Sequence, residues 1–239
     1  MIISCTKGIN ENPFMTMSEA IEKHFNNSSI KVGVLSGPNL AKEIADEKVA
    51  GTVIASKHAD LCHQAREILS SSTFKIYTSD DIKGIELAGA LKNIYAIISG
   101  YCHSLDVGEN AIGLILTRSM AEMSNFAVKK GANPITFLGL AGMGDLVATC
   151  FSKLSRNYQF GWAIGEGLDI EAAKYKVGQV AEGLNTIRII HNEISSSKIK
   201  MPLVSGMHEI LFNSGSKELL LEQIINSDIY VDVNFDVES

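Results

Sequence analysis

The 239-residue sequence has no excess of positive charge. Its 21 lysines and arginines stand against 27 acidic residues, for a formal net charge of −6. Nucleic-acid backbones select basic protein faces, so this balance argues against a nucleic-acid partner, although a local basic pocket for a small anion fits it. The apolar content of 46% excludes a disordered chain and is enough for one large core or two smaller ones.

Closely spaced cysteines are also lacking. The four in the chain lie far apart: Cys5, Cys62, Cys102 and Cys150. No pair has the spacing of a zinc site or a redox dithiol, so they are interpreted as small apolar residues in a reducing compartment. The spacing of His58 and His63 points them to different sides of a helix, so no metal site is expected.

Segments that lead a chain to or through a membrane are not expected either. The opening residues, MIISCTKGIN, have no basic start, long apolar stretch or small-residue cleavage site, so a cytoplasmic protein is predicted. The run from Ile85 to Leu105 is long and apolar, but it contains Glu86 and Lys92 and has no anchoring belt around it. We therefore expect no membrane span.

A glycine-rich turn of the dinucleotide-binding type is missing as well. Such domains normally open with a strand, a G-x-G-x-x-G turn and a helix, because glycine lets the backbone approach the pyrophosphate. The sequence contains no such turn.

The first third of the sequence alternates short β-branched runs with helical stretches. Four runs are predicted as strands: 2–5, 31–35, 51–56 and 73–78. Helices are expected from about Thr16, which has capping-box spacing to Glu19, and from Pro38. A third is expected over 59–69. This alternation predicts an α/β layer with a largely parallel sheet.

Beyond residue 80 the pattern changes to long helices with hardly a strand. They are predicted at about 84–105, 110–130, 144–150, 157–166, 182–195, 204–212 and 216–226. The change predicts a domain boundary, with an α/β domain at 1–80 and an all-α domain at 81–239.

Lys92 is the first candidate for chemistry. It and Glu86 are the only charges in the apolar helical segment 84–105. A buried ammonium is unfavourable by several kcal/mol unless it is paired or loses its proton. Desolvation lowers the pKa of a lysine toward neutrality and makes it a usable general acid or base. A lysine that lays its stem along the helix surface is the structural alternative.

Three short motifs combine glycine with polar side chains. SGPNLAKE at 36–43 follows a predicted strand, so the amides after Gly37 could meet an anion or a carbonyl oxygen; a simple turn is the alternative. GLAGMGDL at 139–146 places Asp145 beside glycines that either relieve helix crowding or admit a ligand. GQVAEG at 178–183 places Glu182 between glycines in the same way.

A fourth motif, SRN at 155–157, stands at a predicted helix entrance. It combines a capping hydroxyl, a guanidinium and free backbone amides, which suits a phosphate dianion. A plain helix cap followed by a surface arginine is the alternative.

Taken in order, these motifs resemble one family. The set includes KG at 7–8, SGPNLAKE, ELAGALKN at 86–93, GLAGMGDL with TC, SRN with FG, GQVAEG, and MP at 201–202. It is similar to that of the bacterial-type NAD(P)-dependent glycerol-3-phosphate dehydrogenases, over nearly the whole chain. The resemblance implies reversible hydride transfer between NAD(P)H and dihydroxyacetone phosphate, giving sn-glycerol 3-phosphate for phospholipid synthesis. It also implies the C-terminal part of a Rossmann-like parallel-sheet domain at 1–80 and an all-helical substrate-binding domain at 81–239.

The resemblance also implies roles for individual residues. Lys92 matches the catalytic lysine, which exchanges a proton with the substrate oxygen. Substrate positions fall on Lys7, Gly37, Asn39, Lys92, Asp145, Ser155, Arg156 and Asn157, with Arg156 as phosphate ligand. Cofactor contacts fall on Lys7, Ala41, Arg156, Val180 and Glu182. The implied partners are NAD or NADP, a small phosphorylated substrate and a second copy of the chain in a homodimer.

One departure from the family is large. The family has its dinucleotide turn and several strands before the KG lysine, whereas here Met1 stands shortly before Lys7. By resemblance, the chain lacks the half of the cofactor domain that binds adenosine and pyrophosphate and distinguishes NAD from NADP. Two other functions stay open: a non-catalytic remnant that binds a phosphate ligand or a partner, and a related lysine-dependent dehydrogenase of another hydroxy acid.

Overall fold

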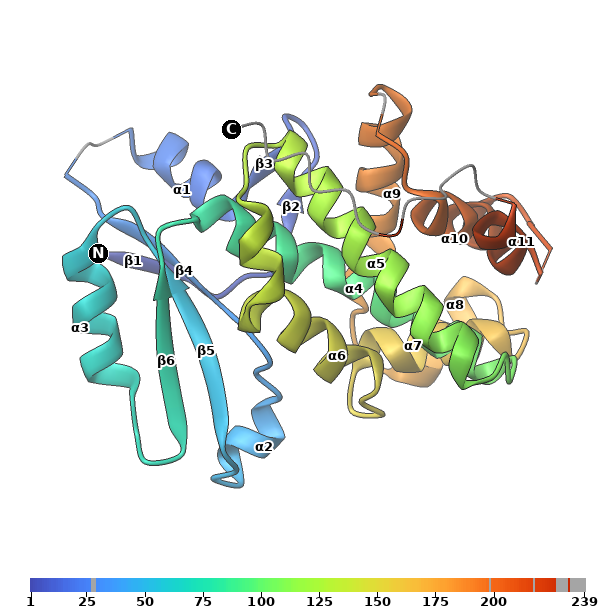
Figure 1. Ribbon diagram of the computed structural model, residues 1–239, viewed down its shortest axis with the longest axis horizontal. Helices are drawn as coiled ribbons and strands as arrows, with labels where there is room; N and C mark the ends of the chain where they lie inside the picture. Colours follow the sequence, from blue (N-terminus) through green and yellow to red (C-terminus); the bar gives the residue numbers. More distant parts are fainter. Residues whose placement is uncertain (27–28, 198, 217, 227–231, 233–239) are drawn as a thin grey trace.

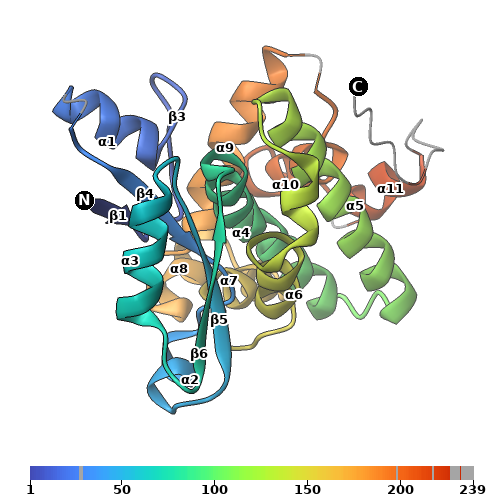
Figure 2. The same cartoon turned by 60° about the vertical axis from the view of Figure 1, so that its left-hand side comes forward.

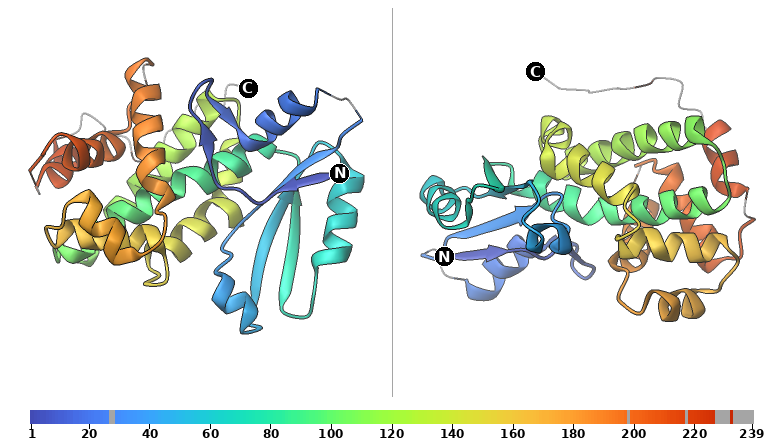
Figure 3. Two further views of the ribbon diagram at one scale, coloured as in Figure 1. Left: turned by 180° about the vertical axis from the view of Figure 1, so that it is seen from behind. Right: turned by 90° about the horizontal axis from the view of Figure 1, so that it is seen from below.

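The computed structural model describes residues 1–26, 29–197, 199–216, 218–226 and 232, and arranges them in a strand-containing part and a helical part (Figure 1). The end of the predicted helical domain, from 227 to 239, lies outside the described residues except for Asp232. Figure 3 shows the strands gathered at one end of the molecule and most helices at the other.

Four strands form the main sheet, in the order β1-β4-β5-β6. They are β1 (Ile2–Ser4), β4 (Val32–Ser36), β5 (Ala50–Ala55) and β6 (Phe74–Ser79). Each predicted strand is therefore confirmed, with small differences at the ends. β1 pairs with β4 and β5 pairs with β6 in parallel, whereas β4 and β5 are antiparallel.

The antiparallel pair follows from the short connection between β4 and β5. The only helix there, α2 (Ala41–Ala45), has five residues and rises about 7.5 Å. That is well short of the roughly 20 Å that a strand spans, so α2 is not a crossover helix; β5 starts at the end where β4 leaves and runs antiparallel to it. The predicted helix start at Pro38 is wrong, because α2 begins three residues later.

The remaining helices follow the predicted order. The sheet part adds α1 (Met17–Phe25) and α3 (Ala59–Leu69). The helical part holds α4 (Ile82–Ser104), α5 (Glu109–Lys129), α6 (Asp145–Cys150), α7 (Arg156–Gly165), α8 (Ile170–Val177), α9 (Glu182–Ser195), α10 (Pro202–Phe212) and α11 (Leu219–Ile225). A 3₁₀ turn at Pro134–Leu138 and a π turn at Leu140–Gly144 precede α6.

A short hairpin and one helix were not predicted from the sequence. The hairpin pairs β2 (Ile9–Asn10) with β3 (Met15–Thr16), strands too short to show a periodic pattern. In α8 only Ala173 is buried, so no apolar stripe marks the helix. Its signals are the N-cap, where Asp169 accepts from the Ala172 N–H, and the left-handed Gly178 at its end.

Alternate residues of β5 point to opposite faces of the sheet and join two separate clusters. Ile54 packs with Leu61 of α3 on one face. Val53 packs with Ile82 and Ile85, at the start of α4, on the other. Figure 2 shows α3 on one side of the sheet and the helical part on the other. α4 therefore begins against the sheet and ends deep among the helices.

α4 is the central element of the helical part and contacts α5, α6, α7 and α9. Its closest neighbour is α7, and glycines allow the backbones of the two helices to come this close. A Cβ at Gly161 would lie 1.8 Å from the Ile97 carbonyl oxygen, and one at Gly100 would lie 2.0 Å from that of Tyr158. This packing holds the N-terminus of α7 beside the middle of α4.

Burial inside the protein explains why α4 is so apolar. No helix in the described part of the chain has the length and mean hydropathy that crossing a membrane requires. The strands described all precede residue 80 and the long helices all follow it, in keeping with the expected α/β and all-α parts. The division into two domains at that residue stays a prediction.

Candidate active site

A cleft of about 1090 Å³ is lined by residues from both parts of the chain. The sheet part contributes the segments after β1 and β4, and the helical part contributes α4, the start of α7 and the start of α9. Among the predicted site residues, those lining it are Lys7, Asn39, Ala41, Lys92, Ser155, Arg156, Asn157, Val180 and Glu182. Gly37 and Asp145 do not line it, but both accept hydrogen bonds from Lys7.

Lys92 lies in the middle of α4, and it is only 7% exposed. Its Nζ donates to Asp145 Oδ1 at 2.8 Å and to Thr149 Oγ1 at 2.6 Å. Burial lowers the pKa of Lys92 below its ordinary value of 10.5; the nearby charge of Lys7 lowers it further, and that of Asp145 opposes the change. The buried amine predicted from the sequence is present, and the alternative of a lysine with its charge in water is excluded.

Asp145 joins two lysines. Its side chain is 2% exposed, and its second oxygen, Oδ2, accepts from Lys7 Nζ at 2.6 Å. Lys7 also donates to the Gly37 carbonyl at 2.9 Å, and its side chain is 23% exposed. When both amines carry their charge, two lysines on one carboxylate leave a net positive charge at the floor of the cleft. Such a charge attracts an anion and stabilises negative charge on a reacting oxygen.

The segment after β4 is held by a close backbone approach. At Gly37 a Cβ would lie 3.0 Å from Thr52 Cα, so a side chain there would push against β5. Asn39 Nδ2 donates to Thr52 Oγ1 at 2.9 Å. Because α2 begins only at Ala41, the amides after Gly37 do not form the helix N-terminus that the sequence predicted.

The start of α7 brings Ser155 and Asn157 together. Ser155 is the N-cap, with its Oγ accepting from the Tyr158 N–H at 3.3 Å, so the capping alternative is confirmed for this residue. Asn157 is buried, donates to Asn93 Oδ1 at 3.0 Å and accepts from the Gly183 N–H at 2.9 Å. One amide thereby joins α4, α7 and α9. The first N–H groups of α7 have no partner within the helix and lie at the cleft.

Arg156 and Glu182 face each other across the rim. The guanidinium of Arg156 donates to Glu182 Oε1 at 3.1 Å, and the two side chains are 43% and 42% exposed. Exposed ion pairs contribute little to stability, so an anionic ligand can replace Glu182 at small cost. Val180 is 73% exposed, and Ala41 stands at the start of α2. The residues predicted as cofactor contacts are thus mostly at the rim.

No role for Thr149 was predicted from the sequence, yet Thr149 contacts the Lys92 amine. Its hydroxyl donates to the Asp145 carbonyl at 2.6 Å and accepts from Lys92. A signal was available, because Thr149 follows Asp145 by four residues and so shares its face of α6. The two residues together fix the position of the Lys92 amine.

Polar atoms left without partners show what the cleft can hold. Asn39 Oδ1 and Asn93 Nδ2 are buried and have no hydrogen-bond partner among the described residues. Buried unpaired groups are unfavourable, so a ligand with its own donors and acceptors is favoured here. The cleft also exceeds the roughly 300–1,000 Å³ of typical small-molecule pockets.

Two family models match this chain. The C-terminal model of NAD-dependent glycerol-3-phosphate dehydrogenase matches residues 81–222, and the N-terminal model of the same enzyme matches residues 1–62. The C-terminal model begins at residue 81, just before α4, whereas the N-terminal model ends at residue 62 within α3.

Individual proteins agree with the family models. Glycerol-3-phosphate dehydrogenase [NAD(P)+] of Pseudomonas syringae pv. tomato is 47% identical over 98% of this chain and 68% of its own length, and that of Pseudomonas putida strain F1 gives the same values. A crystal structure of the Coxiella burnetii glycerol-3-phosphate dehydrogenase matches with a TM-score of 0.89 and 33% identity, covering 94% of this chain and 68% of that one. The Saccharomyces cerevisiae enzyme matches with a TM-score of 0.82 and 27% identity, over 93% of this chain and 67% of that one.

Proposed function

This chain belongs to the NAD-dependent glycerol-3-phosphate dehydrogenase family, and on that premise we propose that it interconverts dihydroxyacetone phosphate and sn-glycerol 3-phosphate with NAD(P)H. The observation that carries the proposal is the buried Lys92 amine, held by Asp145 and Thr149 at a cleft that Arg156 also lines. The product would serve phospholipid synthesis.

The substrate phosphate binds at the start of α7. Arg156 gives up its exposed pair with Glu182 and donates to the phosphate oxygens, as guanidinium groups do with two parallel hydrogen bonds. The free N–H groups of the first turn add to this site, and the helix dipole favours the negative charge. Ser155 and Asn157 keep the turn in place.

Lys92 moves the proton. During reduction, negative charge develops on the ketone oxygen, and the Lys92 ammonium donates a proton to that oxygen; in the reverse direction the neutral amine takes it back. Burial supports this role, because it lowers the pKa of Lys92 and so makes the ammonium a stronger acid. Asp145 orients both amines, and Lys7 stabilises the charge on the oxygen.

Lys7, Ala41, Arg156, Val180 and Glu182 hold the cofactor in this proposal. Once bound, NAD(P)H supplies the hydride. The unpaired Asn39 Oδ1 and Asn93 Nδ2 support a polar ligand deep in the same cleft. Gly37 and Asn39 complete the substrate side.

The proposal is tested by Arg156→Gln in steady-state kinetics. Loss of a charge-assisted hydrogen bond of about 1.5–3 kcal/mol raises KM for dihydroxyacetone phosphate by about 10- to 100-fold. Dihydroxyacetone, which has no phosphate, is turned over poorly by both proteins and does not distinguish them. Arg66→Gln, on the exposed face of α3, is the matched control and keeps the original KM.

The same assay tests one alternative function, and a binding experiment tests the other. If Arg156→Gln left KM unchanged, the phosphate site would be wrong and a dehydrogenase of another hydroxy acid would be favoured. A non-catalytic role is the second candidate, because no G-x-G-x-x-G turn occurs in the sequence. Titration of the 239-residue chain with NADH, followed by nicotinamide fluorescence, decides this point. Saturable binding supports the enzyme, and its absence together with absent turnover supports the remnant.

Compartment and assembly are also proposals. All four cysteines are free, which supports a reducing, cytoplasmic location. Ile135 and Leu138, before α6, are 62% and 58% exposed, and such apolar side chains support contact with a second copy in a homodimer. Sedimentation equilibrium measures the mass directly.

A further inference from the structure

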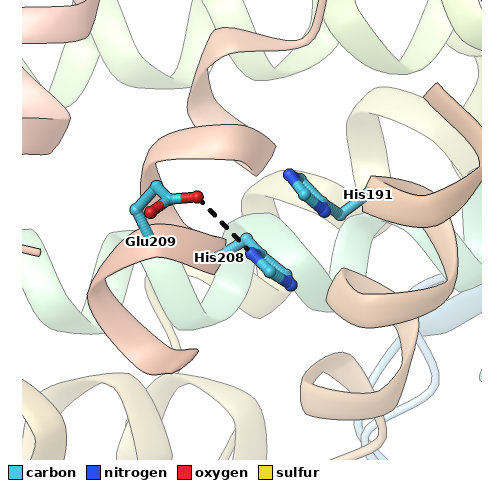
Figure 4. Close-up of side chains that lie close together, drawn as sticks. All are labelled: His191, His208 and Glu209. Atoms are coloured by element: carbon cyan, nitrogen blue, oxygen red, sulfur yellow. Dashed lines mark ion pairs between the residues drawn. The ribbon is translucent and has the colours of Figure 1, made fainter. Parts of the chain in front are cut away.

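Away from the cleft, two histidines and a glutamate meet between α9 and α10 (Figure 4). His191 belongs to α9, and His208 and Glu209 are neighbours in α10. The imidazole rings are stacked, with centroids 3.7 Å apart and 7° between their planes, and Glu209 Oε1 lies 3.9 Å from His208 Nδ1. One ligand atom from each of the three side chains lies within 4.8 Å of the other two.

His208 is the unexplained member of this group. Its side chain is 13% exposed, and its Nδ1 is buried with no hydrogen-bond partner among the described residues. A ring nitrogen without a hydrogen bond can offer its lone pair to a metal ion, which imidazole binds in its neutral form.

Glu209 is already oriented by a neighbour. Asn213 Nδ2 donates to both carboxylate oxygens, at 3.1 and 3.0 Å. An outer hydrogen bond of this kind fixes the direction of a metal-binding carboxylate. The Glu209 side chain is 40% exposed, so an ion can reach the group from solvent and keep water ligands.

We propose that His191, His208 and Glu209 bind a divalent transition-metal ion between α9 and α10. Zn²⁺ takes nitrogen and oxygen ligands at about 2.0–2.2 Å, which places two ligands of a tetrahedral site about 3.3 Å apart. Ligand atoms that now lie within 4.8 Å need to approach by at most about 1.5 Å. Side-chain rotation that opens the ring stack supplies this movement without moving either helix.

The ligand set selects the class of ion. Two imidazoles and a carboxylate favour Zn²⁺, Co²⁺, Ni²⁺ and Cu²⁺, whereas Mg²⁺ and Ca²⁺ prefer sites made of oxygen alone. The ion would link two helices rather than serve the reaction, because His191 does not line the cleft: Ile189, the last residue of α9 that does, precedes it by two positions, which turns the two side chains about 200° apart on the helix. Its presence can therefore be measured without substrate or cofactor.

The test is a titration of the 239-residue chain with Co²⁺, read by its ligand-field absorption. The expected result is one Co²⁺ per chain, displaced by Zn²⁺ and not by excess Mg²⁺. Each of His191→Gln, His208→Gln and Glu209→Gln weakens binding by at least about 10-fold, the effect that losing even an outer partner has at metal sites. Asn213→Ala weakens it by about 10-fold as well. Circular dichroism verifies that each variant is folded.

A second histidine–glutamate pair provides the matched control. On the exposed face of α3, His63 Nδ1 lies 3.5 Å from Glu67 Oε2. This pair has the same side chains as His208 and Glu209 but no second imidazole. His63→Gln leaves Co²⁺ binding unchanged. The proposal is overturned if no absorption develops, or if the signal survives His208→Gln and depends on His63. A chain that binds Co²⁺ as described but does not turn over dihydroxyacetone phosphate would contradict the proposed function and leave this inference intact.

Discussion

The acidity of Lys92 depends on the two charged side chains beside it. Asp145 raises the pKa of the amine and Lys7 lowers it, while burial has the largest effect and lowers it. In the proposed mechanism reduction uses the protonated amine, so we expect the rate to fall as pH rises through the pKa of Lys92, which lies below 10.5. Lys7→Met removes a like charge, so the alkaline limb of the pH–rate profile, where the rate falls, moves to higher pH. Asp145→Asn removes an opposite charge and moves it to lower pH.

The two variants control for each other, because both lower kcat while shifting the limb in opposite directions. The measurement is kcat/KM for dihydroxyacetone phosphate across the alkaline range, and Lys57→Met, on the surface, is the unshifted reference. Equal shifts in one direction would mean that another group controls the limb.

The burial of Lys92 could be predicted from the sequence, but its hydrogen-bond partners could not. Burial followed from the apolar residues around it, which leave no polar face on α4. Asp145 is far away in the chain, and only the packing of α6 against α4 brings its carboxylate within 2.8 Å. The resemblance to a family named Asp145, whereas nothing in the local pattern paired it with two lysines. Arg156 and Glu182 were likewise recognised in separate sequence motifs, and only the fold shows that they form an ion pair.

At the scale of elements, the contact of α4 with α7 depends on glycines, which have no side chain between the two helix backbones. Gly161→Ala would place a methyl group 1.8 Å from the Ile97 carbonyl oxygen, and that atom cannot move without bending α4. We expect the free energy of unfolding to fall by about 3 kcal/mol, measured by urea denaturation. Gly113→Ala is the matched control: it lies on the exposed face of α5 with no atom within 4 Å of the new Cβ. It should stabilise the protein by about 0.5–1 kcal/mol.

Glu122 connects three helices through one buried carboxyl group. It accepts from Tyr95 Oη at 3.0 Å and from the Leu203 N–H at 2.7 Å, joining α5 to α4 and α10. Burial raises the pKa of Glu122 from 4.5 to about 8. The folded state therefore holds the proton more tightly than the unfolded state, so the stability from this group is complete below pH 4.5 and is lost as pH rises through about 8.

Glu122→Gln tests this dependence, because an amide resembles the protonated acid. Relative to the variant, the parent protein should lose several kcal/mol of unfolding free energy between pH 4.5 and 8. Urea denaturation at a series of pH values measures the difference. A constant difference between the two proteins would show that Glu122 is ionised throughout.

Long helices were easier to predict than the sheet topology. α5 and α9 have apolar residues on one face and ended within a residue or two of their predicted limits. The direction of β5 could not be predicted, because parallel and antiparallel pairing place the same residues on the same faces of a strand. That choice depended on how short α2 is, and Gly37–Pro38 had suggested a longer helix.

At the scale of the whole molecule, the cleft joins the two parts of the chain. Lys7 and Asn39 come from the sheet part, and Lys92, Arg156 and Asn157 come from the helical part. A ligand that contacts both sets adds a connection that the free protein lacks. Ligand binding should therefore stabilise the chain against unfolding as a unit.

Thermal unfolding measures this stabilisation by ligand. Glycerol 3-phosphate at a hundred times its Kd adds about 2.7 kcal/mol to the folded state, which raises Tm by about 5–10 °C for a chain of this size. Arg156→Gln, at the same ligand concentration, should lose about half of the rise or more, because its Kd is about 10- to 100-fold weaker. Glycerol alone should not shift Tm in either protein, since it has no phosphate for α7 to bind. Differential scanning calorimetry measures all four combinations, and a shift of the same size in the Arg156→Gln protein would place the phosphate elsewhere.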